Sequence, residues 1–237
     1  LVLLAVGLVL AFLPTLPWNT EEEDPVKDDA VVDNSLEARQ QTLKEFQSHL
    51  PTYTQKALKD LASPQWQALS FLEKDLYLTA YEEWERLQVF ALATLYTSLY
   101  GSLPEELVGI DECEWFSNPA NIRPPCSGVT KRYHHLEICL DSNTASATTI
   151  PPEVSFLENL KSFSVRGTPS ATTTLEGWLP TELGLLQHWT EVVMSNVNLQ
   201  GTIPPYITSS FTNLEIIDWS HNQLSGTLPD DISNLKN

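Results

Sequence analysis

The sequence predicts an α/β solenoid, a right-handed coil of repeated units with a parallel β-sheet on its concave face, preceded by an α-helical amino-terminal cap. A Gly-x-(Ile/Leu)-Pro signature begins at Gly177, Gly201 and Gly226, at spacings of 24 and 25 residues. Two helical patterns precede these signatures, between Ser63 and Gly101. A period of about 24 residues accommodates one strand, one turn and one short helical return, so each unit completes its core by stacking on its neighbours.

The chain opens with an uninterrupted apolar run over residues 1–13, followed by Pro14 and Pro17. Thirteen helical residues rise only about 20 Å, against about 30 Å for the hydrocarbon core of a bilayer. We expect residues 1–17 to be a truncated membrane anchor, with a signal-peptide segment or a buried structural segment as alternatives. The chain does not begin with Met, and we expect it to be part of a longer protein with further repeats beyond Asn237.

Residues 18–62 are expected to form an acidic spacer that is helical in part. Residues 19–34 are acidic with little apolar content, which is the composition of a disordered segment. From Ser35 onward apolar residues return at helical spacing, with one interruption at Pro51. The pattern is typical of a juxtamembrane helix pair or a marginal stalk, and its apolar positions are Leu36, Leu43, Phe46, Leu50, Ala57, Leu58 and Leu61.

Residues 63–126 are expected to form the helical cap. Ser63 followed by Pro64 is a helix start, with serine as the N-cap and proline at the first helical position. A second helix is expected from about Glu82 to Leu99, ended by Gly101. The aromatic side chains of this region are expected to pack in the core: Trp66, Phe71, Trp84, Phe90 and Tyr96.

Residues 127–237 are expected to hold about four repeats, of which residues 214–229 form the best unit. In that unit Asn222 is expected to turn the chain and to bond buried backbone groups. Val197 stands at the corresponding place in the preceding unit, and an insertion over residues 167–174 predicts a protruding loop. The side chains expected to point inward are Leu214, Ile217, Trp219, Leu224 and Leu228.

Cys113, Trp115 and Cys126 precede the repeats in a Cys-x-Trp…Cys element. Together with the L-x-x-L-x-L-x-x-N-x-L pattern and its Gly-x-(Ile/Leu)-Pro ending, this element resembles the plant-type extracellular leucine-rich-repeat proteins. The resemblance covers roughly residues 63–237. It implies a disulfide between Cys113 and Cys126 and an oxidising compartment, while the third cysteine, Cys139, is left unpaired or pairs elsewhere.

Charge and motifs exclude several classes of function. The net charge is −18 and no stretch is rich in Lys or Arg, which argues against nucleic acid as a partner. The sequence has no nucleophile elbow, phosphate loop or zinc-protease motif, so we expect no enzyme and no cofactor. His134, His135 and Cys139 do not have the spacing of a zinc site, and we expect no metal.

Alternate strand positions in the predicted repeats point away from the core and form a predicted binding face. Their mixed, mildly acidic character suits a protein, peptide or polysaccharide ligand. The predicted binding face comprises Glu137, Asp141, Ser162, Ser164, Arg166, Glu191, Val193, Ser195, Ile216, Asp218, Ser220 and His221, and Cys139 shares this side of its strand.

These expectations favour a membrane-tethered recognition module with its repeats extracellular or lumenal. One alternative is a secreted structural or cell-wall protein, or an inhibitor of a secreted enzyme. Another alternative is the ectodomain of a receptor kinase. The repeats themselves indicate binding as the function and leave the ligand open.

Overall fold

The computed structural model describes residues 35–108, 135–140, 147–167, 174–175, 177, 179–186, 188–211 and 213–234. The chain divides into two compact units, Leu1–Val31 and Val32–Asn237, and every described residue belongs to the second. The predicted anchor, the Cys113–Cys126 pair, Asp141 and most of the predicted inserted loop lie outside the described residues. Within the described ranges, no helix has the length and hydropathy needed to cross a membrane.

The amino-terminal half of the described chain is helical: α1 (Leu36–His49), α2 (Thr52–Ala57), α3 (Pro64–Lys74), α4 (Glu83–Tyr100) and the short 3-10 helix η1 (Glu105–Leu107). Local sequence explains the helix ends. The Ser63 hydroxyl accepts a hydrogen bond from the Trp66 amide at 3.1 Å, and Pro64 follows it at the first helical position. Gly101 ends α4 with a φ of +85°, a conformation that glycine adopts without a side-chain clash. The predicted start of α3 and end of α4 are confirmed.

Residues on both sides of position 62 pack into one helical core. Leu43, Phe46 and Leu50 are buried, and the Phe46 ring meets Phe90 of α4 edge to face at a centroid distance of 5.6 Å. The part of the expected spacer from residue 35 onward therefore packs with α3 and α4. Leu36 and Leu61, expected on the same apolar faces, are exposed.

The expectation that all the aromatic residues of this region pack in the core was wrong for two of them. Phe71 and Phe90 are buried and Tyr96 is half-buried, whereas 37% of Trp66 and 55% of Trp84 are exposed. Both tryptophans stand in the first turn of their helices, α3 and α4. The buried positions of each helix begin only later, at Ala68 in α3 and Gln88 in α4.

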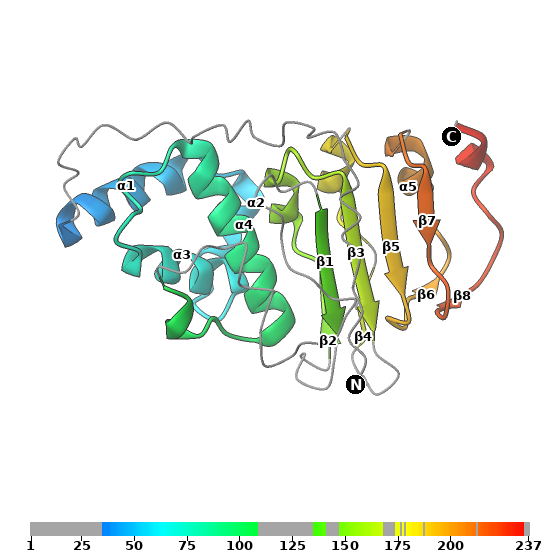
Figure 1. Cartoon of the computed structure of the whole chain (residues 1–237), viewed down its shortest axis with the longest axis horizontal. Helices are drawn as coiled ribbons and strands as arrows, with labels where there is room; N and C mark the ends of the chain where they lie inside the picture. Colours follow the sequence, from blue (N-terminus) through cyan, green and yellow to red (C-terminus); the bar gives the residue numbers. More distant parts are fainter. Residues whose placement is uncertain are drawn as a thin grey trace, which may run out of the picture. The chain divides into compact units, whose positions relative to one another are not determined.

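The carboxyl-terminal half contains a four-stranded parallel sheet of β1 (His135–Leu140), β3 (Ser162–Gly167), β5 (Glu191–Ser195) and β7 (Ile216–Asp218), in that order (Figure 1). Two small parallel sheets pair β2 (Ala147–Thr148) with β4 (Thr174–Leu175), and β6 (Gln200–Gly201) with β8 (Gln223–Leu224). Short helical returns follow the three proline signatures: η5 (Thr181–Leu185), α5 (Pro205–Ser210) and η6 (Asp230–Asn234). A further return, η4 (Pro152–Phe156), follows Pro151 in the first described repeat.

Aromatic side chains stack through the core of successive repeats. The Trp189 ring lies 5.5 Å from Phe163 and 5.2 Å from Phe211, and both pairs are nearly parallel. In the last repeat, Leu214 is buried as expected, and Ile217, Trp219 and Leu224 are partly buried against the core. Leu228, expected to point inward, is 60% exposed, because no later repeat among the described residues covers it.

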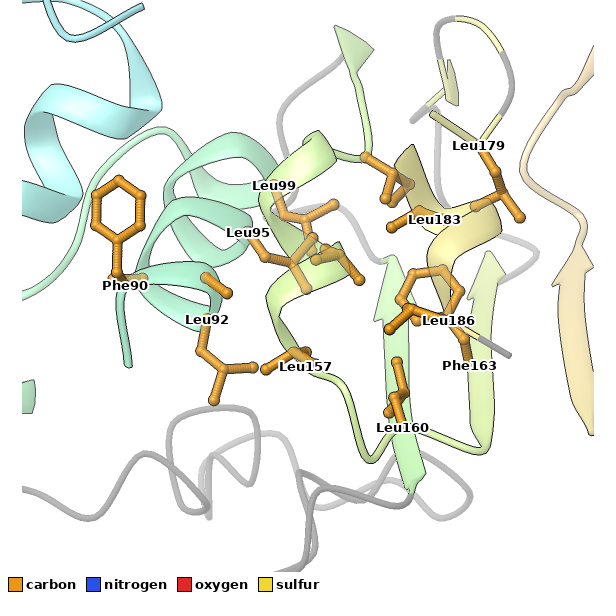
Figure 2. Close-up of a cluster of buried hydrophobic side chains, with 14 of the residues drawn as sticks. Phe90, Leu92, Leu95, Leu99, Leu157, Leu160, Phe163, Leu179, Leu183 and Leu186 are labelled. Carbon is orange, nitrogen blue, oxygen red and sulfur yellow. The ribbon is translucent and has the colours of Figure 1, made fainter. Parts of the chain in front are cut away.

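The helices and the repeats share one hydrophobic core. Helix α4 packs against η4, and its buried leucines belong to the same cluster as those of the repeats. Figure 2 shows Leu92 of α4 beside Leu157, with Phe163, Leu183 and Leu186 further into the repeats. The first described repeat is therefore covered by helix on one side and by the next repeat on the other.

Candidate functional site

The register of the sheet places the predicted binding face in transverse rows. Ser162 pairs with Glu191, and Glu191 pairs with Ile216. In the next row on this face, Glu137, Ser164, Val193 and Asp218 follow one another across four strands, and Cys139, Arg166 and Ser195 form a third. Because side chains two residues apart in a strand share a face, these rows lie on one side of the sheet.

Accessibility varies along the predicted binding face. Ser164 and Val193 are only 2% and 1% exposed, and Ser162 and Ser195 are also buried. Arg166, Glu191 and Asp218 are partly exposed, while Ile216, Ser220 and His221 are exposed. A macromolecule approaching this face would meet the exposed and partly exposed side chains first.

Polar side chains on the face bond one another between repeats. The Ser162 hydroxyl donates to a Glu191 carboxylate oxygen at 2.7 Å. One Arg166 guanidinium nitrogen lies 3.6 Å from a carboxylate oxygen of Asp218, two strands away, and 3.5 Å from the Ser195 hydroxyl. These contacts hold the side chains in place between strands and balance part of the negative charge of the face.

The pKa of Asp218 is lowered from its ordinary value. The Ser220 hydroxyl and then the Ser220 amide, which donates at 3.0 Å, are the main causes, and the positive charge of Arg166 adds to them. Asp218 is therefore ionised at neutral pH. Its half-exposed carboxylate and the Arg166 guanidinium present adjacent opposite charges to solvent.

A second polar cluster, which the sequence reasoning missed, lies where α2 and α3 meet η4. The Glu153 side chain is completely buried, and its two carboxylate oxygens accept hydrogen bonds from the Thr54 hydroxyl at 2.7 Å and the Gln65 amide at 3.0 Å. Thr54 and Gln65 stand 99 and 88 residues before Glu153. No local pattern in the sequence connects positions so far apart.

Metal binding finds no support in the described ranges. Within them, no group of three His, Cys, Asp or Glu side chains is placed to hold a metal ion. The side chains of Glu137 and Cys139 in β1 lie outside what the structure describes.

Residues 213–235 match the Leucine Rich Repeat family model. The chain is 32% identical over 129 residues to Receptor-like protein 55 of Arabidopsis thaliana, an alignment that covers 51% of this chain and 27% of that protein. The chain thus spans about a quarter of the length of this curated relative.

Solved plant structures are also similar in part. The LRR ectodomain of the receptor kinase SOBIR1 from Arabidopsis thaliana is 22% identical, with a TM-score of 0.42, over 62% of this chain and 72% of that one. A plant ice-binding protein is 28% identical, with a TM-score of 0.37, over 43% of this chain and 31% of that one. Residues 213–235 carry a leucine-rich repeat, and about half of the chain is similar in sequence to part of a plant receptor-like protein.

Proposed function

We propose that this chain is a non-enzymatic recognition module that binds a protein or peptide on the predicted binding face. The single observation that carries the proposal is the register of the sheet. It brings Arg166, Glu191, Ile216 and Asp218, from three separate repeats, into adjoining rows on one side. The family match and the similarity to a receptor-like protein support a role in protein interaction.

The chemistry of the face favours a peptide or protein over a polysaccharide. Ile216 is a large apolar side chain with 52% of its surface exposed. The neighbouring Arg166–Asp218 ion pair spans from β3 to β7, the strand that also carries Ile216. Apolar contact together with charges of both signs matches the side chains of a polypeptide. A polysaccharide is the alternative ligand, and its binding would depend less on the charge of Arg166.

We further propose that the repeats form a solenoid and that the helices serve as its cap. An end repeat exposes its apolar flank to water unless something covers it. Helix α4 supplies Leu92, Leu95 and Leu99 to the core shared with the first repeats. This packing supports the proposal that residues 35–108 are the cap.

Membrane tethering through residues 1–17 completes the proposal, with the repeats extracellular or lumenal and a disulfide between Cys113 and Cys126. The apolar composition of residues 1–13 supports it. A protease-protection assay on the full-length protein in sealed vesicles tests it, since cytosolic repeats would contradict it. A mature amino terminus near Asn19 would instead favour the secreted alternative.

Binding to the face is tested by selecting a random peptide library against the full chain and titrating the enriched peptides against variants. We expect Ile216→Asp and Arg166→Glu each to weaken binding at least about tenfold, as a buried hot-spot contact does. Leu185→Asp is the matched control, because Leu185 is 76% exposed on η5, away from the sheet. Peptides that lose affinity for the Leu185 variant and keep it for both face variants would overturn the proposal.

A further inference from the structure

The Glu153 carboxyl lies at the junction between the helices and the repeats. It stands on η4, in the first described repeat, and its oxygens accept hydrogen bonds from α2 through Thr54 and from α3 through Gln65. Glu153 and Thr54 are both 0% exposed. One side chain therefore joins three elements in an environment without solvent.

An ionised carboxylate is costly at such a place. Burial removes its hydration, and hydrogen bonds from neutral donors return only part of that loss. The groups that interact with it are the neutral Thr54 and Gln65, its own backbone amide, and the acidic Glu182 of η5, whose negative charge disfavours a second one nearby. Tyr53 of α2, hydrogen-bonded to Ser155, is the other titratable group of this cluster. Helix α4, the remaining element packed on η4, contributes apolar leucines to the shared core.

We propose that Glu153 is a proton-controlled latch, which holds the helices on the repeats firmly when its carboxyl is neutral and loosens this junction when the carboxyl ionises. In the neutral state the hydrogen bonds to α2 and α3 are kept and no buried charge opposes them. In the ionised state, local opening lets water reach the carboxylate. The latch is independent of any ligand on the sheet face, and acid conditions tighten it.

The titration of Glu153 has the sign that the latch requires. Desolvation by burial, and more weakly the charge of Glu182, raise the pKa of Glu153 above its ordinary value, against the lowering effect of hydrogen bonds from Thr54, the Glu153 backbone amide and Gln65. A carboxyl whose pKa is higher in the folded protein than in the unfolded chain binds its proton more tightly when folded. Its contribution to stability is therefore complete below the unfolded pKa and is lost as pH rises through the folded pKa.

Hydrogen exchange of the full chain between pH 4.5 and 8, corrected for the intrinsic exchange rate, tests the latch. We expect the protection of amides in α2 and η4 to rise on acidification, by up to about tenfold per pH unit between the two pKa values. Amides of α5, distant in the repeats, serve as the reference for the general effect of the net charge. If the ratio of protection between the α2 and η4 amides and the α5 amides stays constant across this pH range, the proposal is overturned.

Substitutions assign the effect to one carboxyl. In Glu153→Gln we expect the protection of α2 and η4 amides, relative to that of α5 amides, to be high and independent of pH. Glu158 is an exposed neighbour, so Glu158→Gln should keep the pH dependence of the wild type. The opposite pattern, with the pH dependence kept in the first variant and lost in the second, would contradict the latch.

Two milder variants keep the test decisive if the first variant does not fold. Thr54→Val removes a hydrogen bond that lowers the pKa of Glu153, so the transition should move to higher pH. Glu182→Gln removes a charge that raises this pKa, so the transition should move to lower pH. Transitions that stay in place in both variants would overturn the assignment to Glu153.

Discussion

The turns that follow β5 and β7 occupy equivalent places in successive repeats, yet one has valine where the other has asparagine. The pairing of Val193 with Asp218 makes Val197 the counterpart of Asn222, each four residues further along the chain and beyond the end of its strand. The Asn222 amide donates to the carbonyls of Met194 and Trp219 at 2.6 and 2.9 Å. Its oxygen accepts from the amides of Val197 and Leu199 at 3.2 and 3.0 Å.

The comparison shows that the asparagine of one repeat serves the backbone of the repeat before it. Val197 is fully buried and donates its own backbone amide to Asn222. Its turn is fixed instead by a neighbour, Asn196, whose side chain donates to the Gly167 carbonyl at 2.9 Å. Asn196 and Asn198 both have a positive φ, 55° and 58°, which asparagine tolerates better than most residues. The two turns thus use different side chains at equivalent places in successive repeats.

Gly167→Ala should give the largest change, because it blocks the approach of the Val197 turn to the preceding repeat. A Cβ at Gly167 would overlap the Asn196 carbonyl oxygen, a backbone atom that cannot rotate away. We expect a loss of about 3 kcal/mol or more in the free energy of unfolding, as for other cases of severe overpacking. Urea denaturation measures it. Gly177→Ala has open space for its Cβ and only the strain of a φ of 80°, so it should cost less. The reverse order would contradict the overlap at Gly167.

Asn222→Val gives the turn after β7 the valine that the turn after β5 has at position 197. The amides of Val197 and Leu199 and the carbonyl of Met194 then lose their partner, with an expected cost of about 2–4 kcal/mol. Urea denaturation is compared with that of Thr227→Val, an exposed position that should change stability by less than about 0.5 kcal/mol. Equal stability of the two variants would show that the asparagine does not hold the preceding repeat.

Val197→Asn is the converse exchange. It replaces a fully buried apolar side chain with an amide, and the expected cost is about 1–3 kcal/mol, for the desolvation of the new polar group. Thermal unfolding followed by circular dichroism measures the change. A variant more stable than the wild type would show that the valine turn could have accommodated the ordinary asparagine.

Asn196→Ala should have the smallest of the four effects. It removes the hydrogen bond to Gly167 and places alanine at a φ of 55°, for an expected loss of about 1–2 kcal/mol. Asn196→Gly loses the same hydrogen bond and relieves the backbone, so it should cost less than alanine. If the two variants lose the same stability in urea denaturation, backbone conformation contributes nothing at this turn.

Sequence predicted the features that depend on neighbouring residues. Ser63 with Pro64 gave the start of α3, Gly101 the end of α4, and Asn222 the turn with its bonds to backbone, because each acts within a few positions or within one repeat period. The shared side of alternate strand positions on the predicted binding face also followed from the period of two along each strand. For these features the residues that form the motif are also the residues that cause the structure.

Features set by distant contacts could not be predicted in the same way. The buried state of Glu153 depends on partners 99 and 88 residues away, and an acidic residue is more often exposed. Trp66 and Trp84 fit the helical pattern, but the core begins only after the first turn of each helix. The burial of Ser164 and Val193 on the predicted face likewise depends on tertiary packing, which alternation along a strand does not report.

The most direct test of the central claim, recognition on the sheet face, is site-specific photo-crosslinking in the cells that produce the protein. A benzophenone side chain is placed at Ile216 in one variant and at Leu185 in another, since both positions are exposed, at 52% and 76%. We expect a discrete crosslinked partner from position 216 that is absent from position 185 and lost when Arg166→Glu is added. The same adduct from both positions, or from position 185 alone, would contradict it.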